Sequence, residues 1–286
     1  MRTDKLMPLF HSSDLCEALI SGKKLLADGG IGTELIKRGV SRDRILEANT
    51  EYTAHVHEIH SEYIAAGADL ITCNSFGGFT SSEMNSLVEQ GIRIAYSTVN
   101  NCTKSIAVMI SVHPGQLLQQ KSRLAEILTD SKYDGLILLV ETCTNLSQTI
   151  EAIDILGELN RNRIFVTGFF NADCVMADGT SVEQFVETIG RLNVGALGAN
   201  CGVAKNNFEE LVKRTTSVYH RPSIFQPAGG IPSISVDGHL QYQVSPADFS
   251  TNCMQLWSFG ASVVGGCCGI GPQHIQAASA LRDTIY

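Results

Sequence analysis

The feature that most constrains the fold is a regular alternation, along the whole chain, of short apolar runs with longer amphipathic runs. A short apolar run bounded by turn residues is typical of a buried strand, whereas apolar residues that recur with a helical period indicate a helix. The expected strands span residues 24–28, 69–74, 105–112, 135–141, 164–170, 196–201, 223–226 and 262–266. The expected helices span residues 50–66, 82–100, 118–129, 146–159, 182–192, 207–218, 246–259 and 272–284.

Eight strand–helix units predict an α/β protein with a closed (β/α)8 TIM barrel. An open doubly wound sheet is the alternative, but such a sheet would not normally need eight units. The segment 227–245 is irregular and carries a hairpin signal at Asp237-Gly238, so we expect an enlarged loop after the seventh strand. No linker or low-complexity tract interrupts the chain, and we therefore expect a single domain over residues 1–286.

Composition narrows the class of protein. The chain is 44% hydrophobic and long enough to bury a large core. Its formal net charge of -8 argues against a surface that binds nucleic acid or anionic membranes, and no apolar run approaches the ~20 residues that span a bilayer. Nine cysteines in apolar segments fit reduced thiols better than a disulfide framework. Since the start lacks a secretory signal, the sequence predicts a cytoplasmic enzyme.

Polar residues and cysteines gather at the ends of the expected strands. In a (β/α)8 barrel, functional groups lie at the C-terminal ends of the strands. The strand ends concerned are Asp28-Gly29-Gly30, Asn74-Ser75-Phe76-Gly77, Glu141-Thr142, Asn200-Cys201-Gly202 and Cys267-Cys268. This clustering is independent of the apolar pattern that places the strands, and it supports the same fold.

Three cysteines are candidate metal ligands. Cys201 closes the sixth expected strand, and the adjacent pair Cys267 and Cys268 closes the eighth. Neighbouring side chains of a strand point to opposite faces, so the pair can reach one ion only if the flanking glycines bend the backbone. Three thiolates with one open position are typical of a catalytic zinc centre, and soft thiolates favour zinc or copper(I) over magnesium or calcium. The alternative is that these cysteines are inert core residues.

With these motifs the chain resembles the homocysteine S-methyltransferase family. That family comprises zinc-dependent barrels, among them the betaine– and S-methylmethionine–homocysteine methyltransferases and the homocysteine module of cobalamin-dependent methionine synthase. The resemblance covers nearly the whole chain, and its most specific part is the Asn-Cys motif followed by Gly-Gly-Cys-Cys-Gly. The matching segments are residues 28–35, 66–69, 74–78, 141–142, 198–202 and 265–269.

The resemblance implies that Cys201, Cys267 and Cys268 hold Zn²⁺ and that the thiol sulfur of homocysteine takes the fourth position. A free thiol has a pKa near ~8.5, and coordination to zinc would deprotonate it at neutral pH. The sulfur would then attack an activated methyl group and yield methionine. No catalytic side chain is implied beyond this zinc-activated substrate thiol.

Asp28 and Glu141 are implied to bind the α-amino group of homocysteine. An ammonium group in a partly dry pocket needs opposite charge and hydrogen-bond acceptors. Glu141 ends a continuous apolar run, where a carboxylate without a function is rare, whereas for Asp28 a turn-capping role is the alternative. The backbone N–H groups of the turn that begins with Gly29 and Gly30 are expected to face the substrate carboxylate.

The methyl donor is left open by the sequence. Where the family usually has Pro-Asn-Ala-Gly after the seventh strand, this chain has Pro227-Ala228-Gly229-Gly230, which leaves open what fills the fourth zinc position before substrate binds. S-Methylmethionine, betaine and a methylcobalamin or folate route are the options. Betaine would favour an aromatic cage, for which the candidates are Phe76, Phe79, Phe169 and Phe170.

Two function classes therefore stay open. The first is a homocysteine S-methyltransferase. The second is a non-catalytic thiol- or zinc-binding barrel, or a homocysteine-binding subunit that acts only with a corrinoid partner protein. The oligomeric state is open as well.

Other histidines and cysteines are expected to be structural. Three histidines belong to the expected helix 50–66, outside the barrel, and surface or capping roles are expected for His55, His57 and His60. Three cysteines near strand ends are expected to be small packing residues, namely Cys73, Cys143 and Cys174.

Overall fold

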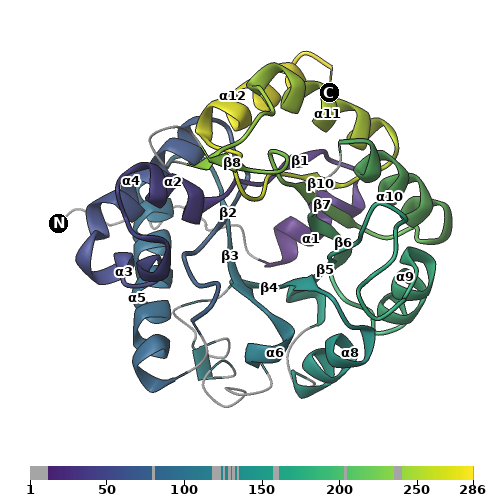
Figure 1. Cartoon of the computed structure of the whole chain (residues 1–286), viewed down its shortest axis with the longest axis horizontal. Coiled ribbons are helices and arrows are strands. Elements are labelled where there is room, and N and C mark those ends of the chain that lie inside the picture. The colour runs from purple at the N-terminus through teal and green to yellow at the C-terminus, as the bar shows by residue number, and fades with distance from the viewer. Residues whose placement is uncertain are drawn as a thin grey trace.

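Eight parallel strands form the central sheet of the computed structural model, in the order β1–β10–β7–β6–β5–β4–β3–β2 (Figure 1). The structure describes residues 12–78, 81–117, 124, 126–127, 130, 133, 135–156, 161–202, 205–234 and 240–285. The strands are β1 (Leu25–Leu26), β2 (Leu70–Thr72), β3 (Ala107–Val112), β4 (Ile137–Cys143), β5 (Ile164–Gly168), β6 (Ala196–Cys201), β7 (Ser223–Pro227) and β10 (Val263–Val264). Each of the eight overlaps one of the strands expected from the sequence, although the ends of several differ.

The two edge strands of this sheet meet and close it. Ala27 and Leu70 form a parallel bridge between the end of β1 and β2. Beside it the Asp28 N–H donates to the Leu70 carbonyl at 2.9 Å, and the Asp69 N–H donates to the Leu26 carbonyl at 2.7 Å. The sheet is therefore the closed barrel that the sequence predicts, and the open doubly wound alternative is wrong.

Helices surround the barrel on its outside (Figure 1). They are α2 (Ile31–Lys37), α3 (Ala48–Glu51), α4 (Thr53–Ala65), α5 (Ser82–Asn100), α6 (Pro114–Leu117), α8 (Leu146–Ile155), α9 (Val182–Gly190), α10 (Lys205–Val218), α11 (Pro246–Ser258) and α12 (Pro272–Arg282). The expected helix 50–66 is divided at Tyr52 into α3 and α4, and most of the expected helix 118–129 lies outside the described residues. The sequence did not predict α2, α6 or a further helix, α1 (Ser12–Ile20).

The formation of α9 illustrates why these segments become helices. Val182, Phe185, Val186 and Ile189 recur with the helical period and are all buried. Ser181 caps the helix by accepting a hydrogen bond from the Gln184 N–H, and the Gln184 side chain accepts one from the Ser181 N–H. The cap satisfies donors that the first turn leaves free, and the apolar face packs the helix onto the barrel.

The interior of the barrel has two kinds of side chain. Toward the end of the barrel where the strands begin, the inward residues form one apolar cluster, called here the apolar layers. It contains Leu25, Ala27, Leu70, Ala107, Met109, Ile137, Leu139, Phe165, Ala196, Ile224 and Val263. Leu15 and Leu19 of α1 join this cluster and cover the end of the barrel where the strands begin. Because inward residues alternate along a strand, the inward positions nearer the C-terminal ends of the strands form a polar layer, comprising Thr72, Ser111, Glu141, Thr167, Asn200 and Gln226.

A histidine in α4 departs from expectation. His60 is completely buried, and neither ring nitrogen has a partner among the described residues. Burial lowers the pKa of His60 to about 4, so the ring is neutral at physiological pH. The expected surface role is therefore wrong for His60, because α4 turns this face toward the core formed with Ile59 and Tyr63.

The segment after β7 forms a small antiparallel hairpin, as expected. Its strands are β8 (Ser233–Ile234) and β9 (Leu240–Gln241), and the predicted turn at Asp237-Gly238 lies outside the described residues. Within the described part of the chain, none of the helices has the length and apolar character needed to cross a membrane.

Candidate metal centre

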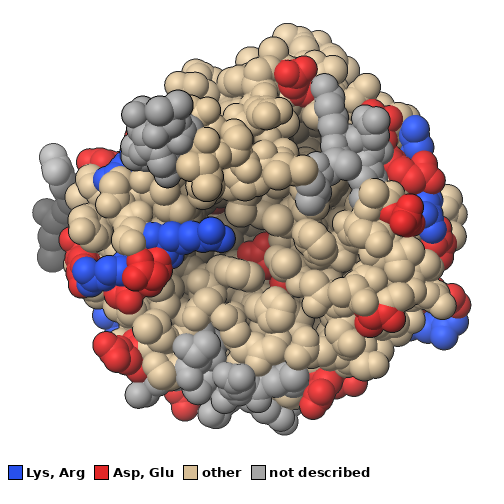
Figure 2. All heavy atoms as spheres, in the orientation of Figure 1, with Lys and Arg blue, Asp and Glu red and all other residues tan. Residues whose placement is uncertain are grey.

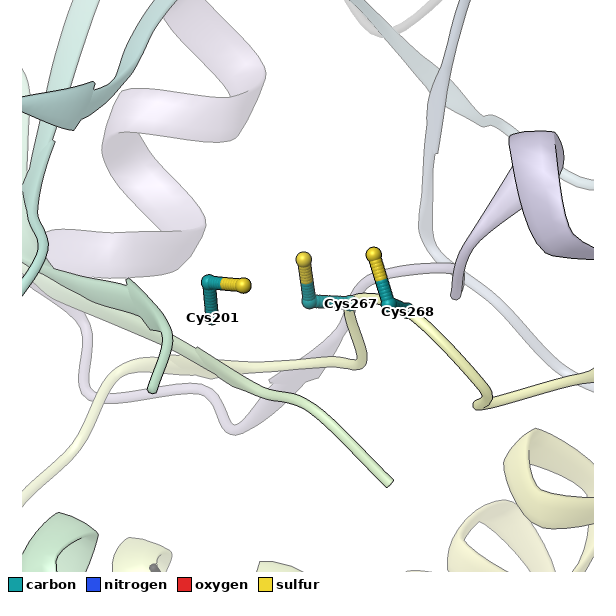
Figure 3. A group of neighbouring side chains, drawn as sticks. All are labelled: Cys201, Cys267 and Cys268. Carbon is teal, nitrogen blue, oxygen red and sulfur yellow. The ribbon is translucent and has the colours of Figure 1, made fainter. Parts of the chain in front are cut away.

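The three predicted metal ligands lie together at the C-terminal end of the barrel. The sulfur atoms of Cys201, Cys267 and Cys268 all lie within 4.8 Å of one another. Figure 3 shows the Cys267 and Cys268 sulfurs side by side and pointing the same way, with the Cys201 sulfur directed toward them. In the described part of the chain this is the one group of three or more histidine, cysteine or acidic side chains with the spacing of a metal site.

A turn after β10 brings the two adjacent thiols to one side. The Gly266 N–H donates to the Asp28 carbonyl at 2.8 Å, and the Ile270 N–H donates to the Cys267 carbonyl at 3.2 Å. Gly269 has φ of 83°, and a Cβ there would lie 2.2 Å from the ring of Tyr242. Only glycine fits such a position without strain, so the glycines that surround the cysteine pair are required by its geometry.

The third cysteine is held in a left-handed backbone conformation. Cys201 has φ of 61°, and Thr142, at the neighbouring end of β4, has φ of 57°. A non-glycine residue in this region is destabilised by about 1–3 kcal/mol, and such residues cluster at functional sites. The conformation turns the Cys201 side chain toward the other two thiols (Figure 3).

The three thiols shift the pKa values of one another. Hydrogen bonds from Cys201 and Cys267 lower the pKa of the Cys268 thiol to about 3. The same neighbours, together with burial, raise the pKa of Cys267 well above its ordinary value. The protein by itself therefore favours one thiolate and opposes a second. A soft divalent cation would remove this opposition, and the three sulfurs fit the ligand set of Zn²⁺ with one position open.

Two carboxyl groups lie inside the barrel near these thiols. The Asp28 carboxylate accepts hydrogen bonds from the Thr72 N–H at 2.6 Å and from the Thr72 hydroxyl at 2.9 Å. Glu141 accepts from the Ser111 hydroxyl and, at 2.6 Å, from the Asn200 amide. Figure 2 shows acidic atoms at the bottom of the hollow in the centre of this face.

Both carboxyl groups hold their protons unusually tightly. Burial, which disfavours the charged form, raises the pKa of Asp28 to about 8, and the Glu141 charge adds to the shift. Burial likewise raises the pKa of Glu141 to about 7, with a further contribution from the charge of Cys268. A cationic group bound between them would stabilise both ionised forms.

Asn200 organises the Glu141 side of the site. Its side-chain oxygen accepts from the Thr142 N–H at 2.8 Å and from the Thr167 hydroxyl at 2.9 Å. Its amide nitrogen donates to Glu141 and to the Thr142 hydroxyl at 2.9 Å. The sequence reading missed this role, although Asn200 stands beside Cys201 in the motif of the sixth strand.

The turn after β1 is partly available to a ligand. The Gly30 N–H donates to the Ile270 carbonyl at 2.9 Å, so this donor is already used. The expectation that it faces the substrate carboxylate is corrected accordingly. A Cβ on Gly29 would lie 2.1 Å from the same carbonyl, so close packing explains the glycine there. For the Gly29 N–H, no partner is found among the described residues.

Tyr242 and Arg42 border the thiols and were not identified from the sequence. Tyr242 follows β9, and burial together with the neighbouring thiol groups of Cys268, Cys267 and Cys201 raises its pKa to about 12. Arg42 belongs to a short 3-10 helix (Arg42–Arg44), and its charge contributes to lowering the pKa of Cys268. The hairpin expected after the seventh strand was the sequence feature that could have indicated Tyr242. For Arg42 the sequence contained no such feature.

The proposed aromatic cage is only partly present. Phe76 is 49% exposed and packs edge-on against His113, with ring centroids 6.5 Å apart. Phe170 is buried and packs against Phe185 on the helix side of the barrel, so its expected place in a cage is wrong. Phe79 lies outside the described residues.

Three other cysteines are packing residues as expected. Cys73, Cys143 and Cys174 are buried, and burial raises the pKa of each thiol. No disulfide joins the eight cysteines that the structure describes.

Several known proteins are similar to this chain in sequence. Methionine synthase from Mycobacterium leprae is 26% identical over 94% of this chain, and the chain spans about a quarter of the length of the mycobacterial methionine synthases that it matches. Homocysteine S-methyltransferase from Escherichia coli is 25% identical over 90% of this chain and 94% of its own length.

Solved structures share the fold. The metallated form of the homocysteine methyltransferase MmuM from Escherichia coli aligns with a TM-score of 0.75 at 23% identity, over 92% of this chain and 98% of that chain. The model of the family described as homocysteine S-methyltransferase matches residues 25–281, from β1 into α12. Since this match spans the whole barrel and both strand ends that carry the thiols, the chain belongs to the homocysteine S-methyltransferase family of enzymes.

Proposed function

We propose that this protein transfers a methyl group to the thiol of homocysteine, forming methionine, and that Cys201, Cys267 and Cys268 hold a Zn²⁺ ion for this reaction. The observation that carries the proposal is the convergence of three sulfur atoms within 4.8 Å at the ends of β6 and β10, in a chain of this family. When bound, Zn²⁺ lowers the pKa of a coordinated thiol and keeps the sulfur a nucleophile at neutral pH.

The carboxyl groups supply the site for the amino group of the substrate. Asp28 and Glu141 are directed into the barrel by Thr72, Ser111 and Asn200. Their raised pKa values leave both partly protonated near neutral pH. An incoming α-ammonium group would favour the ionised forms, so binding would release protons while the charges become paired. This pairing would orient the substrate with its thiol toward the three cysteines.

The substrate carboxylate has fewer assigned contacts. We assign it to the turn after β1, where the Gly29 N–H is available and the Gly30 N–H shapes the turn through its bond to Ile270. A glycine at each position lets the backbone approach a ligand closely.

A second candidate function is a homocysteine-binding unit that acts only with a corrinoid partner protein. It is favoured by one observation: the methionine synthases that resemble this chain are about four times its length, so the matching region is one part of a larger protein. In this case the methyl donor would be carried by the partner. Free S-methylmethionine or betaine would then not be used.

A donor panel separates these candidates. The purified protein would be assayed for zinc content and for methionine formation from homocysteine with S-methylmethionine, betaine and methylcobalamin. About one zinc per chain with turnover of a free donor supports the first candidate. Homocysteine binding without turnover, and activity only after a methylated corrinoid protein is added, supports the second. A protein that binds neither zinc nor homocysteine contradicts both.

The organisation and location of the protein are part of the same proposal. We assign residues 1–286 to one homocysteine-binding barrel domain, since the family match extends over residues 25–281. Eight described cysteines without a disulfide fit a reducing compartment such as the cytoplasm.

A further inference from the structure

Gln226 is a buried amide with an unused acceptor. It lies in β7 and is 5% exposed, and its side-chain oxygen has no hydrogen-bond partner among the described residues. More than about 90% of buried polar groups in proteins are hydrogen-bonded, and each exception needs an explanation. Leaving such a group unpaired destabilises the folded state, so its presence points to a partner that binds from outside the chain.

The side chain points into the barrel at the level of the site. Ile224, two residues earlier in β7, belongs to the apolar layers, and residues two apart in a strand share a face. Gln226 is paired in register with Asn200 of β6. The amide of Asn200 in turn donates to Glu141 at 2.6 Å. Gln226 therefore adjoins the residue that holds the Glu141 carboxylate.

On its other side Gln226 faces β10, where the corresponding position is a glycine. Val264 is paired with Phe225, and the Gly265 N–H donates to the Phe225 carbonyl at 3.0 Å, so Gly265 lies at the level of Gln226. A Cβ on Gly265 would lie 2.7 Å from the Ala27 side chain and 3.0 Å from the Asp28 carbonyl. No β10 side chain can therefore separate Gln226 from the end of β1, where Asp28 lies.

Gln226 also lies directly below the thiols. The Cys267 N–H donates to the carbonyl of Pro227 at 2.9 Å, and Pro227 is the next residue of β7 and pairs with Cys201. The strand register thus places Gln226 at the level of Asn200, which holds Glu141, and one residue before the level of the thiols.

We infer that Gln226 is a specificity residue that accepts a hydrogen bond from the α-ammonium group of the thiol substrate, as a third acceptor beside Asp28 and Glu141. The inference rests on the proposed function. An ammonium group has three N–H donors. Two carboxylates already exceed its single charge, so a third acceptor that is neutral completes the hydrogen bonds without adding an unpaired charge. Gln226 therefore selects thiols that carry an amino group.

The test compares two thiols on the zinc-loaded protein by isothermal titration calorimetry. One is homocysteine, and the other is 4-sulfanylbutanoate, which has the same thiol and carboxylate but no amino group. We expect Gln226→Leu to weaken homocysteine binding roughly 10- to 100-fold, the effect of losing a hydrogen bond to a charged group. Binding of 4-sulfanylbutanoate should change less than about twofold. Gln255→Leu, on the exposed face of α11, is the matched control and should change neither affinity.

A thermal measurement separates this role from a structural one. Gln226→Leu removes an unpaired buried polar group at similar volume, so the ligand-free variant should melt at the same temperature as the wild type or higher. A structural glutamine would predict a lower melting temperature and equal losses for both thiols. If Gln226→Leu does not fold, Gln226→Met is used in the same comparison.

The outcomes are distinct. A selective loss of homocysteine binding supports the inference. Unchanged homocysteine affinity in a variant that still binds zinc, or equal losses for both thiols, overturns the inference and leaves the proposed function standing. A zinc-loaded wild-type protein that does not bind homocysteine overturns both.

Discussion

The two parts of the barrel interior differ although the same strands form both. In the apolar layers, side chains such as Leu139 and Ile224 are buried against one another. In the polar layer, two positions further along the same strands, Glu141 and Gln226 occupy the corresponding inward sites. Burial of the first kind drives folding by removing apolar surface from water, whereas burial of the second kind destabilises the fold unless each polar group is paired.

This difference indicates that the apolar layers stabilise the fold and that the polar layer serves function. The end of the barrel with the polar layer also holds left-handed residues at Thr142 and Cys201 and carboxyl groups whose pKa values burial has raised. Each of these features opposes stability, and natural proteins retain such features mainly at functional sites. Substitutions in the apolar layers should therefore reduce stability without changing substrate binding. Substitutions in the polar layer should weaken substrate binding without reducing stability.

The largest effect is expected at the thiols. Cys267→Ala should lose zinc and reduce methionine formation roughly 10³-fold, because a metal supplies several kcal/mol of stabilisation to such a reaction. Metal analysis and an activity assay check this. Cys102→Ala, at a half-buried thiol near the end of α5, is the matched control and should retain both. An active, metal-free Cys267→Ala variant would sink the zinc assignment.

In the apolar layers the expected effect is on stability alone. Leu139→Ala should reduce the free energy of unfolding by about 2–5 kcal/mol, because it removes buried methyl groups and leaves a cavity. Chemical denaturation of the metal-loaded protein measures this change. Zinc content and the KM for homocysteine should stay at wild-type values wherever the variant is folded. A changed KM with unchanged stability would contradict the separation of the two parts.

In the polar layer we expect a loss of substrate binding without a loss of stability. Glu141→Gln should weaken homocysteine binding roughly 100-fold, since a charge-assisted hydrogen bond to the ammonium group is lost. Its free energy of unfolding should not fall, because a neutral amide replaces a buried acid. Glu183→Gln is the matched control: Glu183 forms an ion pair with Arg214 outside the barrel, and its loss should leave binding unchanged. Wild-type affinity in Glu141→Gln would remove Glu141 from the binding site.

The smallest effect is on the pH dependence of stability. Asp28 and Glu141 have pKa values of about 8 and about 7 in the folded protein, above their ordinary values of 3.8 and 4.5. These two groups therefore bind more protons in the folded state than in the unfolded state within this window. His60 and Cys268 act in the opposite direction, because their pKa values are lowered in the folded protein. The contribution of Asp28 and Glu141 to the free energy of unfolding should therefore fall, by several kcal/mol in order of magnitude, as the pH rises from 5 to 8, and the opposite contributions reduce the net change.

Urea denaturation of the metal-free protein at several pH values measures this slope. Glu141→Gln should have a shallower slope, because one of the two groups no longer titrates. A pH slope of Glu141→Gln equal to that of the wild type would show that Glu141 does not take up a proton within this window.

Much of the fold followed from local patterns. The strand 196–201 and the helix 82–100 were predicted with their observed ends, because continuous apolar runs and amphipathic periods are set by neighbouring residues. The short helices α1, α2 and α6 were not predicted. The seven-residue α2 begins directly after Gly30 and contains Gly32, so its helical period is short and weak. His60 was wrongly expected at the surface, because the helical period of apolar residues does not show how deeply a face of the helix is buried by its neighbours.

Some features of the candidate site could likewise be predicted from the sequence, and others only from the structure. By itself the sequence determined which candidate groups stand at the strand ends: three cysteines and two acids at the ends of four strands, with glycines where the backbone must bend. Only the tertiary structure decided which other groups meet them, namely Asn200 on Glu141, Tyr242 beside the thiols and the unpaired amide of Gln226. The physical reason is that strand and turn formation depend on residues close in the chain. Hydrogen bonds, burial and the resulting pKa shifts depend on side chains that closure of the barrel brings together.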